Sequence, residues 1–281
     1  MIEVIKTGLF SSIQDKGRFG FENFGVPISG SMDQFSYAHS NKLLNNKDND
    51  AVLEITMTGP ELKFHEKTKI CITGADISPK LNNKSIGLNF IHFVEKGDVL
   101  SFGKIKYGIR SYIGIKGGFL TTDVMGSRSM CLNVTNSFRI KKGEFLKFKP
   151  ITEIKKNSYV SEIENFDHFK NFKIKVYKGP EFNKLSENQK NKIFKKEFTI
   201  SNYNNRMAYQ LNEILENKLE PIISSLVMQG TVQLTPSGKL IILMRDNQTC
   251  GGYPRILQLS ESSINTLSQK YYGNKIMFEI I

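Results

Sequence analysis

The densest group of chemically capable side chains lies near the C-terminal end of the sequence. Residues 240–244 are apolar, and residues 245–255 read RDNQTCGGYPR. An acid, two amides, a hydroxyl, paired glycines and an aromatic ring directly after a strand are more than a turn requires. The pattern indicates a ligand-binding loop, whose candidate residues are Asp246, Gln248, Thr249, Gly251, Gly252 and Tyr253.

Cys250 lies in the same loop and is a nucleophile only if a neighbouring base activates it. Nothing in the sequence assigns such a base to it. A small packing residue is therefore the preferred interpretation.

A second group, Gly126-Ser127-Arg128-Ser129, places an arginine between two hydroxyls. A guanidinium can give two parallel hydrogen bonds to a carboxylate or phosphate, so Arg128 and Ser127 are candidates for anion binding. Four residues are a weak pattern, and their spacing alone does not establish anion binding.

A third group spans residues 14–20, QDKGRFG, and 25–33, GVPISGSMD. The glycines permit a positive φ or a close backbone approach. Asp15 and Arg18 either pair with each other across a tight turn or face a ligand, and the residues alone leave both interpretations open.

Several other chemistries find no signature. The four histidines are isolated, and none has the spacing of a metal site. No Walker A sequence and no Gly-x-Gly-x-x-Gly after a strand occur, so an ATP site on this chain would not be a P-loop.

Short strands separated by turns must position these groups. Residues 109–116 alternate with a period of two, and Gly117-Gly118 ends the run. Similar strands are predicted at 69–73, 144–148, 172–177, 239–244 and 275–280. Few long amphipathic helices separate them, which favours an all-β fold of barrels or sandwiches.

Two helices are predicted from capping boxes. One begins at Ser31 with Gln34 and runs through Leu43, and the other begins at Ser186 with Gln189 and ends near Lys196. A short helical turn is expected after Ser260.

The polar stretch 151–168 has little periodicity and predicts a linker. The expected division is an N-terminal β-barrel subdomain over 1–150, a linker over 151–170 and a C-terminal barrel subdomain over 171–281.

The composition is that of a globular chain with basic excess: 281 residues, 39% hydrophobic, and a formal charge of +12. The lysines are spread over the whole chain without an arginine-rich run, so a solvated surface is favoured over nucleic-acid binding. Attraction of anionic substrates or of an acidic partner protein is a further use of this charge.

Three widely spaced cysteines without C-x-x-C spacing fit a reducing compartment. Neither a signal peptide nor an apolar run long enough for a membrane helix occurs. A cytoplasmic location is expected.

The order of these motifs resembles the family described as allophanate hydrolase subunit 2, KipA or the C component of 5-oxoprolinase, which is related to biotin-dependent carboxyltransferases. The resemblance rests on Gln14-Asp15 with Gly17-Arg18, Val26-Pro27 with Ser29-Gly30 and Met32-Asp33, Leu53-Glu54-Ile55 with Gly59-Pro60, Thr73-Gly74-Ala75-Asp76, Gly126-Ser127-Arg128-Ser129, Lys178-Gly179-Pro180, Asn205-Arg206-Met207 with Tyr209, Gly230 with Gln233, and Asp246 through Pro254. It covers nearly the whole chain.

The resemblance implies two β-barrel subdomains related to cyclophilin, and a protein that works with B-type and A-type subunits. Together they convert 5-oxo-L-proline, ATP and water to L-glutamate, ADP and phosphate, with Mg²⁺ expected beside the ATP. Our candidate catalytic residues are Arg128, Arg206 and Asp246. We expect Arg128, Arg206 and the loop from Asp246 to Tyr253 to converge on one cleft, with Arg128 binding an anionic oxygen and Asp246 acting as a polar orienter or a base. Implied substrate-binding residues are Asp15, Arg18, Ser127, Gln233, Gln248, Thr249, Gly251, Gly252 and Tyr253.

The sequence departs from the family pattern at three positions. Ala208 replaces a common glycine, Gln229 replaces a common proline, and Cys250 replaces a common threonine. Ala208 in particular predicts an altered loop if glycine there adopts a positive φ.

Two alternative functions follow from the same resemblance. One is biotin-dependent carboxyl transfer, for which biotin would come from another protein, because the chain has no Met-Lys-Met biotinylation sequence. The other is a KipA-like regulatory protein that binds an inhibitor of a histidine kinase.

Overall fold

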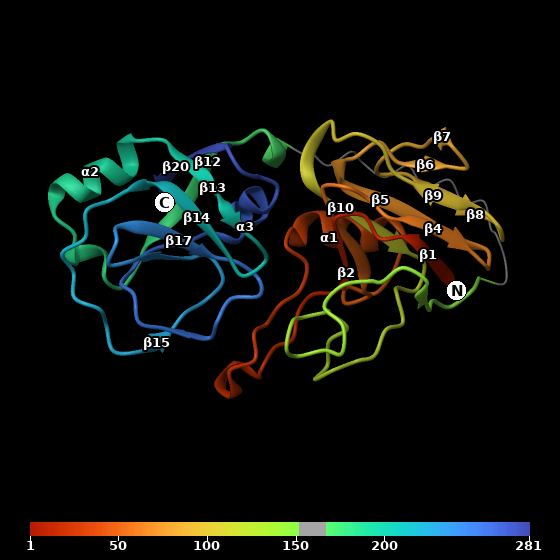
Figure 1. Cartoon of the computed structure of the whole chain (residues 1–281), viewed down its shortest axis with the longest axis horizontal. Coiled ribbons are helices and arrows are strands. Elements are labelled where there is room, and N and C mark those ends of the chain that lie inside the picture. Colours follow the sequence, from red (N-terminus) through yellow and green to blue (C-terminus); the bar gives the residue numbers. More distant parts are fainter. Residues whose placement is uncertain (152–166) are drawn as a thin grey trace. The chain divides into compact units, whose positions relative to one another are not determined.

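A computed structural model describes residues 1–151 and 167–281 (Figure 1). It divides into two compact units. Unit 1 comprises Met1–Arg18 and the described part of Asp33–Phe166, and unit 2 comprises Phe19–Met32 and Asp167–Ile281. The chain therefore leaves unit 1 after Arg18 and returns to it at Asp33. Most of the predicted linker 151–170 lies outside the described residues, and 167–169 form the short helix η2 (Asp167–Phe169).

Unit 1 contains two sheets. The first has the order β11-β1-β4-β9-β6-β7, with bounds β1 (Ile2–Lys6), β4 (Glu61–Phe64), β6 (Lys80–Leu81), β7 (Lys84–Ser85), β9 (Val99–Ser101) and β11 (Phe145–Leu146). The second has the order β2-β3-β10-β5-β8, with bounds β2 (Phe10–Gln14), β3 (Val52–Thr56), β5 (Thr68–Asp76), β8 (Ile91–Val94) and β10 (Tyr107–Ile115). One apolar core, which includes Val4, Ile55, Phe64 and Ile113, serves both sheets.

The central strand β10 is buried on both faces, because helix α1 (Gln34–Leu43) covers the face that carries Tyr112. The backbone N–H of Asp33 donates to the Tyr112 hydroxyl at 2.8 Å. Burial raises the pKa of Tyr112 well above its ordinary value, and the carboxylates of Glu54 and Asp33 raise it further. The phenol therefore stays neutral.

The N-cap of α1 is Asp33, so the predicted start at Ser31 is wrong by two residues. The Asp33 carboxylate accepts from the N–H groups of Phe35 and Ser36, each at 3.1 Å. Ser31 belongs to the segment that joins unit 2, so it is not available to cap the helix. Serine and aspartate are both favourable N-cap residues, so the sequence pattern did not distinguish Ser31 from Asp33.

Unit 2 is a closed barrel of seven strands in the order β12-β19-β16-β17-β14-β13-β20. The bounds are β12 (Lys173–Lys178), β13 (Phe198–Asn204), β14 (Ala208–Ile214), β16 (Thr231–Leu234), β17 (Lys239–Leu243), β19 (Arg255–Leu259) and β20 (Lys275–Ile280). Parallel pairing of β12 with β20, with Ile174 opposite Phe278, closes the barrel. A separate two-stranded sheet joins β15 (Ser225–Leu226) to β18 (Cys250–Gly251).

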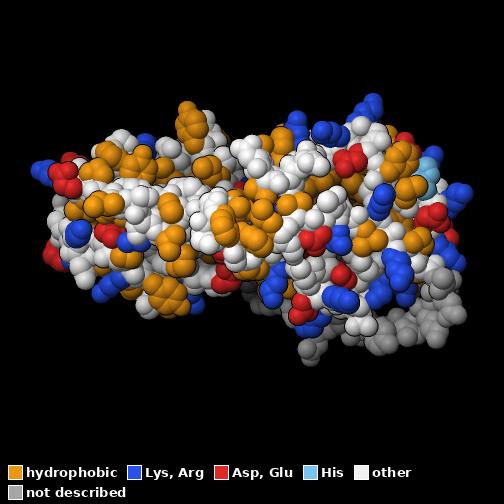
Figure 2. Space-filling view, turned by 90° about the horizontal axis from the view of Figure 1, so that it is seen from below, with side chains coloured by type: hydrophobic (Ala, Val, Ile, Leu, Met, Phe, Trp, Pro, Cys, Tyr) orange, Lys and Arg blue, Asp and Glu red, His pale blue; other side chains and the backbone are white. Residues whose placement is uncertain are grey.

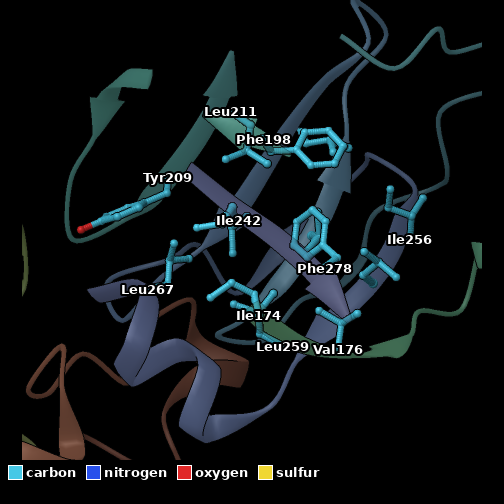
Figure 3. Close-up of a cluster of buried hydrophobic side chains, with 14 of the residues drawn as sticks. Ile174, Val176, Phe198, Tyr209, Leu211, Ile242, Ile256, Leu259, Leu267 and Phe278 are labelled. Carbon is cyan, nitrogen blue, oxygen red and sulfur yellow. The ribbon is translucent and has the colours of Figure 1, made fainter. Parts of the chain in front are cut away.

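Alternating side chains fill the barrel, as Figure 3 shows. Phe198 and Phe278 meet with ring centroids 5.4 Å apart, and Ile242 is fully buried in the same core. Met32 also belongs to this core, although it comes from the N-terminal part of the chain. Helix α3 (Glu261–Ser268) adds Ile264 and Leu267.

The remaining helices are short. Helix α2 (Glu187–Lys195) has the predicted capping box between Ser186 and Gln189, and α3 is the predicted helix after Ser260. The short helices η1 (Glu22–Phe24) and η3 (Phe182–Lys184) complete unit 2. The all-β prediction is confirmed, and each predicted strand overlaps an observed one.

Side chains of different types are mixed on the surface that Figure 2 shows. On the face shown in Figure 2, lysine and arginine side chains are interspersed with acidic, apolar and neutral ones. Within the described residues, no helix is long and apolar enough to cross a membrane.

The barrel core gives a direct stability test. Ile242→Ala should lower the free energy of unfolding by about 3 kcal/mol, because it leaves a cavity in a closed core. Ile223→Ala is the matched control, since Ile223 is 95% exposed, and its effect should stay within about 0.5 kcal/mol. Denaturant unfolding of the whole chain measures both, and equal effects would contradict the packing described.

Candidate functional site

Arg206 and Asp246 form a bidentate ion pair in unit 2. Arg206 lies in the turn between β13 and β14, and Asp246 follows β17. The Nε of Arg206 donates to Oδ2 of Asp246 at 2.8 Å, and Nη2 donates to Oδ1 at 2.9 Å. Both side chains are largely buried, so the pair holds the β13–β14 turn against the end of β17.

The same pair holds segment 19–32 on the barrel. Nη2 of Arg206 also donates to the carbonyl of Gly30 at 2.6 Å, and the Ser29 hydroxyl donates to Oδ1 of Asp246 at 2.6 Å. A carboxylate with both oxygens engaged in this way is suited to orienting its neighbours. The geometry favours that role over the alternative of a general base.

Arg245 reinforces this attachment. Its Nη1 donates to Oε1 of Gln229 at 2.6 Å, its Nη2 contacts Glu261, and its carbonyl accepts from the N–H of Ser29 at 3.0 Å. Gln229, which the resemblance marks as a departure from a common proline, supplies a side-chain acceptor for Arg245.

A buried amide lies under the glycine loop. Gln233 is 1% exposed, and its Oε1 accepts from Nε2 of Gln248 at 3.5 Å. A Cβ on Gly251 would come within 2.5 Å of Nε2 of Gln233, so a larger residue at this position would displace the Gln233 amide. Within the described residues, Nε2 of Gln233 has no hydrogen-bond partner. Three predicted binding residues therefore lie together.

The rest of the loop is tied to segment 222–227. The carbonyls of Thr249 and Gly252 accept from the N–H groups of Val227 and Ile222, each at 3.0 Å. Cys250 and Tyr253 are exposed. Ala208 is the first residue of β14 and pairs with Leu243 without a positive φ, so the family glycine is not needed there.

A second buried ion pair was missed by the sequence reasoning. Arg255 donates from Nε and Nη2 to the two oxygens of Glu181 at 3.0 and 2.9 Å, and from Nη1 to the Ser225 hydroxyl at 2.8 Å. The Arg255 hydrogen bonds lower the pKa of Glu181. The pair fixes β15, which supports the glycine loop. The arginine that ends the loop motif was the available signal, but its partner lies 74 residues away.

In unit 1, Asp15 organises the Gly-Ser-Arg-Ser motif. Its carboxylate accepts from the Ser127 hydroxyl at 2.7 Å, the Ser129 hydroxyl at 2.6 Å and the backbone N–H of Arg128 at 2.6 Å. It also caps its own turn through the N–H of Gly17 at 2.9 Å. Asp15 is 1% exposed, so these hydrogen bonds are formed on the buried side of the loop.

Arg18 serves the same loop. It is fully buried and donates to the carbonyls of Val124 at 2.9 Å and Ser129 at 3.1 Å. The sequence left open a surface ion pair between Asp15 and Arg18. In the structure both side chains are buried, and each instead forms hydrogen bonds with the loop that contains Arg128. A contact of either residue with substrate stays a prediction.

Arg128 lines a pocket of about 300 Å³ in unit 1. Its Nη1 donates to the carbonyl of Thr121. Arg128 belongs to unit 1, whereas Arg206 and Asp246 belong to unit 2. The structure brings the last two together, and the convergence of all three on one cleft stays a prediction.

Among the residues that the structure describes, no three His, Cys, Asp or Glu side chains gather as a metal site.

The chain belongs to the family described as "Carboxyltransferase domain, subdomain A and B", whose model matches residues 24–280. It is 28% identical to the C component of the Haemophilus influenzae 5-oxoprolinase, over 100% of this chain and 91% of that protein. It is 29% identical to the C component of the Escherichia coli 5-oxoprolinase, over 99% of this chain and 90% of that protein.

Urea-metabolising enzymes are also similar. The chain is 38% identical to the urea amidolyase of Lachancea kluyveri over 45% of this chain and 7% of that protein. The crystal structure of the Kluyveromyces lactis urea amidolyase matches with a TM-score of 0.88 and 26% identity, over 100% of this chain and 18% of that one. The crystal structure of TTHA0988 shares the fold, with a TM-score of 0.89 and 22% identity over 99% of this chain and 56% of that one.

Removal of the Glu181 charge tests the second ion pair. Glu181→Gln should lower the unfolding free energy at pH 7 by about 2 kcal/mol, because Arg255 loses a charged acceptor. The folded pKa of Glu181 lies below its ordinary value of 4.5. Its contribution is therefore present above that pH and lost as the pH falls through the folded pKa.

The unfolding curves of wild type and Glu181→Gln should accordingly converge as the pH falls below about 4.5. Glu279→Gln is the control, since Glu279 pairs with Lys173 on the surface and its loss should change little. A constant gap between wild type and Glu181→Gln across the pH range would contradict the assigned role.

Asp15→Asn tests the organisation of the unit 1 loop. An amide offers one acceptor oxygen where Asp15 uses two, so the variant should unfold with about 3 kcal/mol less free energy. Asp123→Asn is the control, because Asp123 is exposed and caps only the N–H of Gly126. If denaturant unfolding gives both variants the same stability, Asp15 does not organise the loop.

Proposed function

We propose that this chain is the C-type component of an ATP-dependent 5-oxoprolinase, which acts with A-type and B-type subunits. The observation that supports this most is the match to two 5-oxoprolinase C components over nearly the full length of all three chains. The reaction would convert 5-oxo-L-proline, ATP and water to L-glutamate, ADP and phosphate.

The chemistry explains why ATP is consumed. A lactam amide is stabilised by resonance and resists attack by water. Transfer of the ATP phosphoryl group to the lactam oxygen would release ADP and make the ring carbon electrophilic. Water would add to that carbon, the ring C–N bond would break as the nitrogen takes up a proton, and hydrolysis of the resulting acyl phosphate by a second water would release phosphate and L-glutamate. Charge that develops on phosphoryl and carbonyl oxygens needs cations and hydrogen-bond donors held in place beforehand.

The residues of this chain divide into two roles. Arg206 and Asp246 are positioning residues, because their charged groups are engaged with each other and with Ser29 and Gly30. Arg128 is the better candidate for contact with an anionic oxygen, since it lines a pocket. Gln233, Gln248 and the glycine loop offer amide and backbone donors at the end of the barrel.

No ATP-binding site is assigned to this chain. The sequence has no Walker A motif, so we assign no residue of this chain to the phosphates of ATP or to Mg²⁺. The nucleotide would be held by other donors or by a partner protein of the complex.

A second candidate is biotin-dependent carboxyl transfer. The higher identity to urea amidolyase, 38% over nearly half of the chain, favours it. Biotin would be carried by another protein, and this chain would supply the acceptor site.

An omission assay tests the proposal. The A-type and B-type subunits from the same organism are supplied with 5-oxo-L-proline, ATP and Mg²⁺, with this chain present or omitted. We expect 5-oxoproline-dependent phosphate release to fall to background on omission, because the ring-opening site is incomplete without the chain.

A parallel reaction offers urea in place of 5-oxoproline, together with ATP, bicarbonate, a biotin carboxylase and a biotinylated carrier protein. Release that is unaffected by omission would refute the oxoprolinase assignment. Activity in the reaction with urea, without activity in the reaction with 5-oxoproline, would establish the carboxyltransferase function instead.

A further inference from the structure

A pocket of about 300 Å³ opens in unit 1 beside the Gly-Ser-Arg-Ser motif. Its walls come from four segments: 120–124, 128–130, 134–137 and 144–147, the last of which includes β11. The size lies at the lower end of the range for small-molecule sites. The lining mixes apolar side chains, such as Leu120, Met130 and Leu146, with threonine, serine and asparagine.

Among the described residues, Arg128 is one of two cationic residues that line this pocket, and the protein fixes its backbone. Asp15 accepts the Arg128 N–H at 2.6 Å and holds the hydroxyls of the two flanking serines. The Thr121 carbonyl accepts from Nη1. The backbone and one end of the guanidinium are thus held before any ligand arrives, which lowers the entropy cost of binding.

The Nε and Nη2 donors of Arg128 have no hydrogen-bond acceptor in the described part of the chain. No carboxylate there forms an ion pair with Arg128, and Nε and Nη2 meet no protein acceptor. A half-buried arginine usually has its donors satisfied, and the planar fork matches a carboxylate. The unused donors are the feature that a ligand would satisfy.

The charge balance of the lining points to a monoanion. Lys147 adds a second cation, while Glu144 adds one negative charge and accepts from the N–H of Lys141 at 2.9 Å. The net excess of one positive charge suits a single carboxylate. A polyphosphate would bring several charges close to Glu144.

We propose that this pocket binds a small organic carboxylate, with Arg128 as its principal partner and the apolar wall packed against the carbon skeleton. The identity of that ligand as 5-oxo-L-proline rests on the proposed function. Sequence reasoning singled out Arg128 but not the wall that segments 134–137 and 144–147 provide.

Binding to the full chain tests the pocket itself. Calorimetry or ligand-detected NMR compares 5-oxo-L-proline with 2-pyrrolidinone, which has the same ring without the carboxylate, and with acetate and inorganic phosphate. We expect 5-oxo-L-proline to bind at least about tenfold more tightly than 2-pyrrolidinone, because a charge-assisted bidentate contact is lost in the neutral ring.

The variants separate charge, geometry and folding. Arg128→Ala and Arg128→Gln should each weaken 5-oxo-L-proline binding by about tenfold or more, and Arg128→Lys should recover only part of it. Arg139→Ala is the matched control, since Arg139 is an exposed arginine over the ring of Phe138 and should bind as wild type does. Unfolding midpoints of all four variants show that the fold is intact.

The assembled complex distinguishes the carboxylate site from the proposed function. With active A-type and B-type subunits, Arg128→Gln should raise the KM for 5-oxo-L-proline about tenfold and leave the KM for ATP unchanged. Carboxylate binding that depends on Arg128 in an inactive complex would refute the oxoprolinase assignment and keep the pocket. Equal binding by wild type and Arg128→Ala, equal affinity for 2-pyrrolidinone, or a preference for phosphate would overturn the carboxylate site.

Discussion

The bidentate pair of Arg206 and Asp246 is the interaction on which the arrangement of unit 2 depends. It joins three pieces of chain that are distant in sequence: the turn before β14, the end of β17, and residues 29–30. A buried guanidinium and carboxylate tolerate the loss of water only while each has the other and further hydrogen bonds. Met32 follows directly after this attachment and enters the barrel core.

In unit 1, the buried carboxylate of Asp15 likewise holds together segments that are distant in sequence. One carboxylate gathers two serine hydroxyls and two backbone N–H groups, and so shapes the loop that carries Arg128. In both units the acids that look catalytic in the sequence act on the protein itself. The group left with unused donors is an arginine side chain, which is what recognition of an anion requires.

The local features of the fold were predictable, and the long-range ones were not. The alternation over residues 109–116 identified β10, and the Ser186–Gln189 spacing identified α2, because both depend on neighbours in sequence. The competition between Ser31 and Asp33 for the α1 cap was settled by segment 19–32 joining unit 2. The partnership of Glu181 with Arg255 depends on barrel pairing, and no local pattern encodes it.

The passage of segment 19–32 into unit 2 has a consequence for how this protein can change during evolution. The chain crosses between the units after Arg18 and after Met32, and the described residues from Asp167 onward belong to unit 2. A single recombination point within 152–166 would therefore separate the barrel from Met32, Ser29 and Gly30. Exchange of the barrel for a related one would therefore have to include segment 19–32 as well, because that segment belongs to unit 2.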